Sequence, residues 1–399
     1  MLNMNLRRCS VWGLVLLTAL FSLEVRADDA SNPPAEKTDW GSVTVHPSRA
    51  LLDVAHRPAD GKLLLPESLP QVVSAYLNGE PSLYLPIEIN SDASKIAVVA
   101  PREGVIAVRT CDTSGQTDLG EILFTAREAE VHGKQAKLES HPGNYRIGFW
   151  SNADDYVTWD YQATRWGKYS VALTYSTASP DGTEIEVEMG GEKVAGTLKS
   201  TGSWYVYHTI ELGDLYLAKE GPQVLIVRCT KKVGGAVMNL KAVILQPICE
   251  GTPPVQAEDG SLLLHGRDAA IQGTRLRYEP AEKKQTLGYW TKPQDTAVWS
   301  YKLTAGGRFD VEVLQGCGAG QGGSSMTLVN FDPNNRTQSK PLNFFVEDTG
   351  HFQNFRPRVV GQIELTPGEY LLYLRPVEIA KTAACDVRQI RLIPVIETE

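Results

Sequence analysis

The sequence predicts an all-β chain of three antiparallel β-sandwich domains, of which the last two are copies of each other. Apolar and polar side chains alternate along residues 157–163 and 297–303, which is the period of two of a half-buried strand. No segment after residue 27 shows the period of an amphipathic helix. Because parallel sheets usually need helical crossovers, we expect the sheets to be antiparallel.

The first 27 residues predict an export signal rather than a folded element. Arg7 and Arg8 precede an almost wholly apolar stretch, 11–23, and residues 25–27 resemble a cleavage site. No later stretch approaches the ~20 apolar residues of a membrane span. We therefore expect a secreted or periplasmic protein without a membrane span.

Residues 38–117 predict a small β-sandwich. Short apolar runs such as 72–77 and 83–89 are separated by prolines and by the Asn78-Gly79 turn. Short strands with turn residues every eight to twelve positions are typical of an all-β domain.

The remainder contains one domain twice, at 118–249 and 255–399, joined by a linker at 249–254. At a constant offset of 140 residues, seven positions match between the copies. They are Gly148, Trp150, Asp155, Trp159, Tyr161, Thr164 and Gly167, against Gly288, Trp290, Asp295, Trp299, Tyr301, Thr304 and Gly307. A repeat of this length indicates a duplicated domain. Duplication favours binding over catalysis, because avidity rewards a second copy.

Charge and cysteine content exclude several classes of protein. Without residues 1–27 the chain has 36 basic and 46 acidic residues, which argues against nucleic acid or an anionic membrane as partner. The five cysteines that remain form no CxxC pair, which disfavours a structural zinc site. An odd number spread over the chain does not indicate a disulfide framework.

Two stretches resemble known families. The segments LLDVAHRPADGKLLLP (51–66) and LPQVVSAYLNG (69–79) make residues 50–105 resemble the β-sandwich behind the catalytic barrel of bacterial secreted α-L-fucosidases. The repeat, with G-[FY]-W-x4-D-x3-W and GGAVMNLKAVIL (234–245), resembles galactose-binding-like jelly rolls of the carbohydrate-binding type. The resemblance implies two such jelly rolls and a catalytic barrel that is absent, and therefore no fucosidase activity.

The aromatic residues divide into core and loop candidates. Trp150, Trp159, Trp290 and Trp299 are expected in the core, because two of them lie within the apolar alternation. Seven further residues, six with rings and one asparagine, are candidates for carbohydrate contact from loops. They are Trp166, Trp204, Tyr205 and Tyr207 in the first copy, and His351, Phe352 and Asn354 in the second. The alternative is that they cap the sandwiches or meet a neighbouring domain.

Polar clusters allow further roles. Asp154, Asp155 and Asp295 lie in turn-like segments, where they either stabilise a turn or bind sugar hydroxyls. A structural Ca²⁺ would need six to eight oxygens. The candidates for that site are Glu128, Glu130 and Asn239 in the first copy, and Asp268 and Asp386 in the second, where Ala270 replaces one glutamate. No catalytic motif and no cofactor site stands out.

The sequence therefore predicts a secreted, non-catalytic carbohydrate-binding protein that assists polysaccharide degradation, with a fucosylated or sulfated glycan as ligand. Two alternatives remain open. The chain is a structural or cell-envelope protein that packs against protein partners, or it is an accessory subunit that docks onto a separate glycoside hydrolase.

Overall fold

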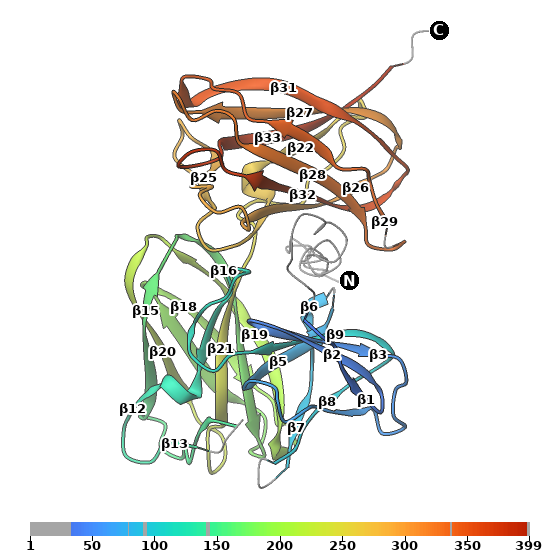
Figure 1. Ribbon diagram of the computed structural model, residues 1–399. Coiled ribbons are helices and arrows are strands. Elements are labelled where there is room, and N and C mark those ends of the chain that lie inside the picture. Colours follow the sequence, from blue (N-terminus) through green and yellow to red (C-terminus); the bar gives the residue numbers. More distant parts are fainter. Residues whose placement is uncertain (1–32, 79, 91–93, 141–143, 336, 397–399) are drawn as a thin grey trace.

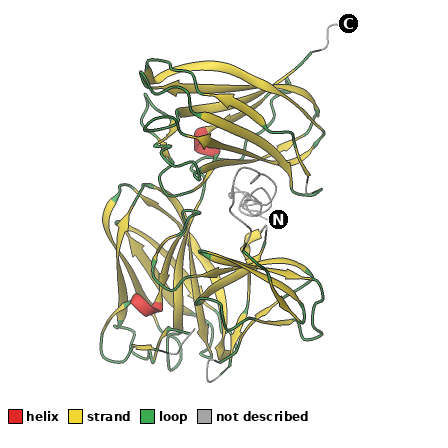
Figure 2. Cartoon of the chain, viewed as in Figure 1, coloured by secondary structure: helices red, strands yellow, loops and turns green. Residues whose placement is uncertain are grey.

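The computed structural model describes residues 33–78, 80–90, 94–140, 144–335 and 337–396. The predicted export signal, 1–27, lies outside these residues. The predicted all-β class is confirmed: strands β1 to β33 are joined by antiparallel pairing (Figures 1 and 2). The helical elements of the described chain are two single 3-10 turns, Ala126–Glu128 and Gly266–Asp268. Within that part, no helix has the length and apolar character needed to cross a bilayer.

The N-terminal domain has two sheets. The larger, in the order β1-β2-β3-β9-β5-β6, consists of β1 (Glu36–Thr38), β2 (Gly41–His46), β3 (Arg49–Val54), β9 (Gly104–Thr110), β5 (Val72–Leu77) and β6 (Glu80–Leu85). The smaller consists of β7 (Ile87–Ile89), β8 (Ile96–Val99) and β4 (Lys62–Leu64). Their inner faces enclose a core that includes Trp40 and Leu52.

Copy 1 is a sandwich of two sheets. One contains β10 (Gly115–Gln116), β11 (Ile122–Thr125), β21 (Asn239–Pro247), β16 (Gly167–Thr177) and β19 (Ser203–Leu217), with β13 (Lys137–Glu139) and β14 (Arg146–Gly148) at its side. The other contains β12 (Glu130–His132), β15 (Tyr156–Ala163), β20 (Gly221–Lys231), β17 (Thr183–Met189) and β18 (Glu192–Leu198). We call the first the inner sheet, because it faces the N-terminal domain, and the second the outer sheet (Figure 1).

Copy 2 repeats this arrangement, and we give its two sheets the names of the equivalent sheets of copy 1. Its inner sheet contains β24 (Arg277–Glu279), β25 (Thr286–Gly288), β33 (Asp386–Pro394), β27 (Gly307–Cys317) and β31 (His351–Leu365), with β22 (Leu262–His265) on β33. Its outer sheet contains β23 (Ala270–Gln272), β26 (Thr296–Leu303), β32 (Gly368–Glu378), β28 (Ser325–Asp332), β29 (Thr337–Gln338) and β30 (Leu342–Phe345).

Even the irregularities of the two copies coincide. The register between β16 and β19 shifts after Val171, and that between β27 and β31 shifts after Val311, 140 residues later. Gly213 and Gly361 lie opposite these bulges with φ of 144° and 156°. Bulges favour glycine because side chains rarely adopt such angles. The strand pairing therefore supports the duplication seen in the sequence.

The four repeated tryptophans are core residues, as predicted. Trp150, Trp290 and Trp299 are fully buried, and Trp159 nearly so. Equivalent hydrogen bonds hold two of them: the indole N–H of Trp159 donates to the Thr125 carbonyl, and that of Trp299 to the His265 carbonyl, both at 2.8 Å.

The N-terminal domain and copy 1 share a continuous sheet. Strand β19 pairs with β7, where Val206 lies opposite Glu88 and Tyr207 opposite Ile87. A buried ion pair reinforces this junction, because the Arg109 guanidinium donates to the Glu121 carboxylate from Nε at 2.9 Å and from Nη2 at 2.7 Å.

Copy 2 contacts copy 1 through a different set of groups. The guanidinium of Arg277 lies against two rings, 4.2 Å from the centre of Trp166 and 3.8 Å from that of Tyr289. Its Nη1 also contacts the carboxylate of Glu220 at 3.1 Å. The buried Arg165 donates to the Leu276 carbonyl at 3.1 Å. Cation–π contacts and charge-assisted hydrogen bonds thus join the two copies.

Candidate functional site

The two copies bury opposite faces, and this difference locates the candidate site. In copy 1 the N-terminal domain covers the side of the inner sheet that faces away from the core of that copy. Leu123, Ala172, Ala242 and Ile244 pack there against Val73 of β5. Small and apolar side chains therefore occupy the face that a neighbouring domain covers.

The same face of copy 2 is polar. The strand registers make Glu312 equivalent to Ala172, Gln389 to Ala242 and Arg391 to Ile244. Glu312, Gln389 and Arg391 are each partly exposed. The edge strand β31 also carries Pro357, which has no backbone N–H to offer to another strand. This side of copy 2 thus has the composition of a solvated sheet.

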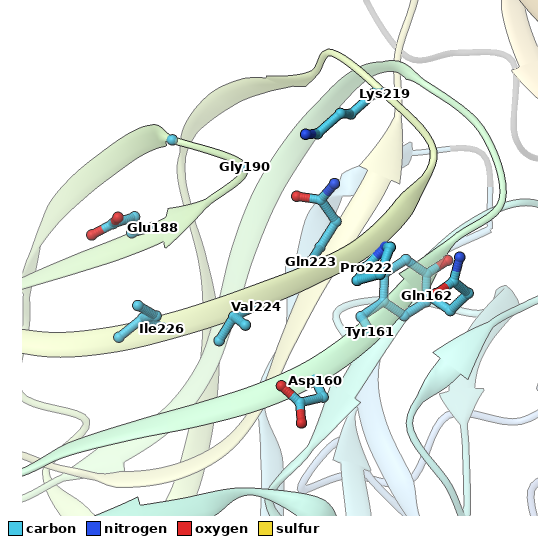
Figure 3. A pocket seen from close by; sticks show the side chains of 11 residues that line it. Asp160, Tyr161, Gln162, Glu188, Gly190, Lys219, Pro222, Gln223, Val224 and Ile226 are labelled. Atoms are coloured by element: carbon cyan, nitrogen blue, oxygen red, sulfur yellow. The ribbon is translucent and has the colours of Figure 1, made fainter.

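The outer sheet shows the reverse. In copy 1 its exposed face forms an open groove of about 800 Å³ between β15, β20 and the β17–β18 hairpin (Figure 3). Asp160 and Gln162 project from β15, and Glu188 from β17. Val224 and Ile226 of β20 form an apolar strip between them. Lys219, Gln223 and Tyr161 contribute to one end.

The charges of this groove are partly balanced. The Glu188 carboxylate accepts a hydrogen bond from Arg228 Nη1 at 3.0 Å and lies 3.4 Å from Lys193 Nζ. Asp160 adds a second carboxylate and Lys219 an ammonium group. Burial raises the pKa of the nearby Tyr161 hydroxyl well above its usual value. The groove thus presents carboxylate and amide groups beside an aliphatic strip.

Copy 2 carries apolar or aromatic side chains at the equivalent positions. Val329 replaces Glu188, Leu371 replaces Val224 and Tyr373 replaces Ile226, according to the registers of the outer strands. Leu371 and Tyr373 are buried in a cluster with Leu119 from the segment before β11. The outer face of copy 2 is therefore a packing surface, whereas that of copy 1 is open.

The structure places the predicted contact residue Trp166 between the copies. It lies on the turn between β15 and β16, as expected, but its indole N–H donates to the Tyr278 carbonyl at 2.8 Å. Its ring meets that of Tyr289 edge-on, with the centroids 5.4 Å apart. Of the two roles left open by the sequence, this geometry corresponds to contact with a neighbouring domain.

The other three candidates of copy 1 lie in a strand rather than a loop, because β19 already begins at Ser203. Trp204 is partly exposed, and its carbonyl accepts hydrogen bonds from Ser176 and Asn239. Tyr205 is exposed, 5.9 Å from the guanidinium of Arg146. Tyr207 is fully buried in the N-terminal core, where a ligand cannot reach its ring.

The candidates of copy 2 likewise lie in a strand, at the start of β31. His351 and Asn354 are exposed, and the Asn354 amide donates to the Thr349 carbonyl. Phe352 is partly exposed and covers the glycine-rich loop 318–324 between β27 and β28, since a Cβ at Gly318 would lie 2.7 Å from its ring. The structure thus brings these three side chains to one end of the inner sheet.

Asp155 and Asp295 have a structural role, but their partners differ from those expected. Each carboxylate accepts three backbone N–H groups from a loop about twenty residues earlier, 134–136 and 274–276, at 2.6 to 3.0 Å. Burial would raise the pKa of Asp155, yet these backbone donors hold that pKa below its usual value. The sequence correctly indicated a turn but could not show that the aspartate holds a second loop.

The calcium candidates lie apart or are engaged otherwise. The Glu128 carboxylate accepts the Ser114 backbone N–H, Glu130 is exposed beside His132, and the Asn239 amide donates to Trp204. Within the described residues, no three His, Cys, Asp or Glu side chains gather in a way that could hold a metal ion.

A pair of acidic side chains distinguishes copy 2 at the position of Asn239. Asp386 occupies it, and the buried Glu279 lies close by, with Lys284 as its ion-pair partner. Burial, followed by the charge of Glu279, raises the pKa of Asp386 to about 7. In copy 1 the equivalent glutamate, Glu139, pairs with Arg146 at 2.8 Å.

Sequence reasoning missed the groove residues. Asp160 and Gln162 occupy the polar phase of the same alternation that placed Trp159 in the core. That phase marks a solvent-facing side of a strand, but it does not show whether a domain covers that side or a groove forms there. The contrast between Val224 and Leu371 was visible in the sequence only once the strand registers were known.

Comparisons with known proteins give a limited result. No protein-family model matches the chain, and no curated protein matches it. Among solved structures, a family 35 carbohydrate-binding module from Clostridium thermocellum is 18% identical, covers 31% of this chain and 96% of its own, and has a TM-score of 0.28. The family 35 module of Cellvibrio japonicus Abf62 is 16% identical over 31% of this chain and 91% of its own, with a TM-score of 0.27.

A Paenibacillus xanthan lyase covers 92% of this chain and 36% of its own length, at 12% identity and a TM-score of 0.30. The similar structures thus include carbohydrate-binding modules and an enzyme that acts on a polysaccharide. The resemblance of residues 50–105 to fucosidases stays a prediction.

Proposed function

We propose that this protein binds a carbohydrate chain in the outer groove of copy 1. The observation that carries the proposal is the open groove itself, in which the side chains of Asp160, Gln162 and Glu188 flank the strip of Val224 and Ile226 (Figure 3). Carboxylates accept hydrogen bonds from sugar hydroxyls. Amides donate hydrogen bonds to sugar hydroxyls and also accept them. The aliphatic strip suits the C–H face of a sugar ring. Ligand sites typically combine an apolar lining with a few placed polar groups.

The charge of the groove favours a neutral glycan. Arg228 and Lys193 pair with the Glu188 carboxylate, and Lys219 supplies an ammonium group beside the carboxylate of Asp160. The charges of the groove therefore nearly balance, so it offers no excess of positive charge to attract a sulfated or uronic polymer. Of the glycans predicted from the sequence, we therefore propose a neutral, fucosylated polysaccharide, bound without catalysis by an exported protein that assists its degradation.

A second carbohydrate contact is proposed at the start of β19. Tyr205 is exposed beside Arg146, whose guanidinium pairs with Glu139. Tyr205 offers an aromatic face beside these hydrogen-bonding groups, and the partly exposed Trp204 precedes it in the same strand. Trp204 and Tyr205 are among the candidates from the sequence, and they lie on the inner sheet of copy 1, whereas the groove lies on its outer sheet.

Affinity electrophoresis of the full chain tests both locations. Native gels would contain fucoidan, the same fucoidan after desulfation, or xyloglucan. We expect retardation in the neutral polysaccharides, and a roughly tenfold weaker affinity for D160A/Q162A, because each lost hydrogen bond contributes about 0.5–1.5 kcal/mol. The matched control is K302A, which alters the position of copy 2 equivalent to Gln162.

The outcomes separate the candidate functions. Loss of retardation in Y205A but not in D160A/Q162A would place the site at β19 and overturn the groove. Retardation only in the sulfated polymer would contradict the neutral ligand. No retardation in any gel, together with co-purification of a glycoside hydrolase or an envelope protein, would replace carbohydrate binding by protein docking.

A further inference from the structure

Two cysteines of copy 2 lie opposite each other on neighbouring strands of the inner sheet. The last printed pair in the register of β27 and β33 is Gly316 with Asp386. One further step along these antiparallel strands brings Cys317, the last residue of β27, opposite Cys385, which directly precedes β33. Residues opposite each other in an antiparallel pair have Cα atoms about 4.5–5.5 Å apart, within the range that a disulfide spans.

The side chains of this pair point to the same side. Cys317 and Cys385 both belong to the hydrophobic core of copy 2, and each is at most 1% exposed. Both are free thiols in this structure. Because opposite residues of a sheet project on one face, the two sulfur atoms share one region of the core. A disulfide there would need no change of strand pairing.

Copy 1 differs at this place in the sheet. In copy 1 the equivalent residues are Thr177 and Met238, which follow the pair Ser176 and Asn239 in the register. Cys229 lies opposite Ile185 in the outer sheet. The paired arrangement is therefore particular to copy 2.

We propose that Cys317 and Cys385 are a site of oxidative modification, at which the folding chain forms an intramolecular disulfide. The Cys317 thiolate attacks one sulfur of a disulfide-bearing oxidant and displaces its first thiol. The Cys385 thiolate then attacks the Cys317 sulfur and displaces the second. Two protein thiols are oxidised to one S–S bond, and the oxidant's disulfide is reduced to two thiols that keep both protons.

Burial confines this reaction to the time before the core closes. Only a thiolate is nucleophilic, and burial raises the pKa of Cys317 to about 11 and that of Cys385 well above its usual value. The folded protein should therefore protect both sulfur atoms, whether they are thiols or a disulfide. The proposal is independent of the carbohydrate-binding function.

Peptide mapping of the full chain tests it directly. Protein refolded with glutathione disulfide is denatured in iodoacetamide without a reductant and digested with trypsin. We expect a cross-linked species that joins peptide 309–336 to peptide 382–388 and is two hydrogen atoms lighter than their sum. Recovery of both peptides with alkylated cysteines would overturn the proposal.

A thermal measurement gives a second readout. The variant C317T/C385M reproduces the pair found in copy 1 and so keeps the core filled. Wild type refolded in dithiothreitol should melt roughly 5–10 °C below wild type refolded with glutathione disulfide, because the reduced unfolded chain keeps a long loop open, and the variant should melt at the same temperature after both treatments. An equal response of the two proteins, or none in the wild type, would contradict the proposal.

Discussion

Replacing Arg109 by methionine should uncouple the N-terminal domain from copy 1. The Arg109 guanidinium bonds Glu121 from two nitrogens, Gln246 at 3.0 Å and Ser74 at 3.2 Å, and it lies 4.2 Å from the ring of Tyr76. The side chains of the ion pair are only 1% and 3% exposed. R109M therefore leaves a buried carboxylate without its counter-charge, which typically costs about 3–5 kcal/mol.

Chemical denaturation measures this effect, with two companion variants. Because well-packed apolar groups often replace a buried pair at no loss, R109M/E121L should regain most of the lost free energy of unfolding. The exposed pair of Lys231 and Glu184, 3.0 Å apart, provides the control, since K231A should cost less than about 1 kcal/mol. A cost below about 1 kcal/mol for R109M, or no recovery in the double variant, would refute the argument that burial makes this pair matter.

Three further predictions follow from other contacts. D295A should lower the free energy of unfolding by about 3–5 kcal/mol in urea denaturation, because three backbone N–H groups lose their acceptor; a loss under 1 kcal/mol would contradict this. W166A removes a ring that Arg277 covers, so limited proteolysis should cleave the 249–254 linker several-fold faster, and an unchanged rate would show that Trp166 does not hold the copies together. Because the pKa of Asp386 is raised to about 7, the folded state retains a proton that the unfolded chain releases near pH 4. The free energy of unfolding should therefore fall by roughly 3 kcal/mol as pH rises from 4 to 7. D386N, which introduces the residue of copy 1, should abolish this slope in pH-dependent melting.

The sequence predicted the fold class because its strongest signals are local. The alternation around Trp159 and Trp299 indicates which side of each strand is buried. Because the same pattern occurs in both copies, each occurrence supports the assignment of the other. Asp155 shows where this reasoning ends, since its backbone partners at 134–136 lie on a loop whose position only the folded chain defines. Local periodicity gives the face of a strand and not its distant neighbours.

The sites were harder to predict, because they depend on how the domains pack. Tyr207 is predicted on a loop but is buried, because β7 of the N-terminal domain extends the sheet past β19. Trp166 lies on a turn, yet copy 2 covers it. Conversely, Asp160 and Gln162 look like ordinary surface residues in the sequence. Only the structure shows that their face of copy 1 forms a groove, whereas the equivalent face of copy 2 is buried. Domain packing thus decided which exposed-looking residues stay exposed.

Isothermal titration calorimetry with a neutral fucosylated oligosaccharide tests the central claim most directly. Since the outer face of copy 1 is open and that of copy 2 is covered, the account predicts one groove site per chain, lost in D160A/Q162A and retained in K302A. Two equivalent sites per chain, or unchanged binding by D160A/Q162A, would contradict it.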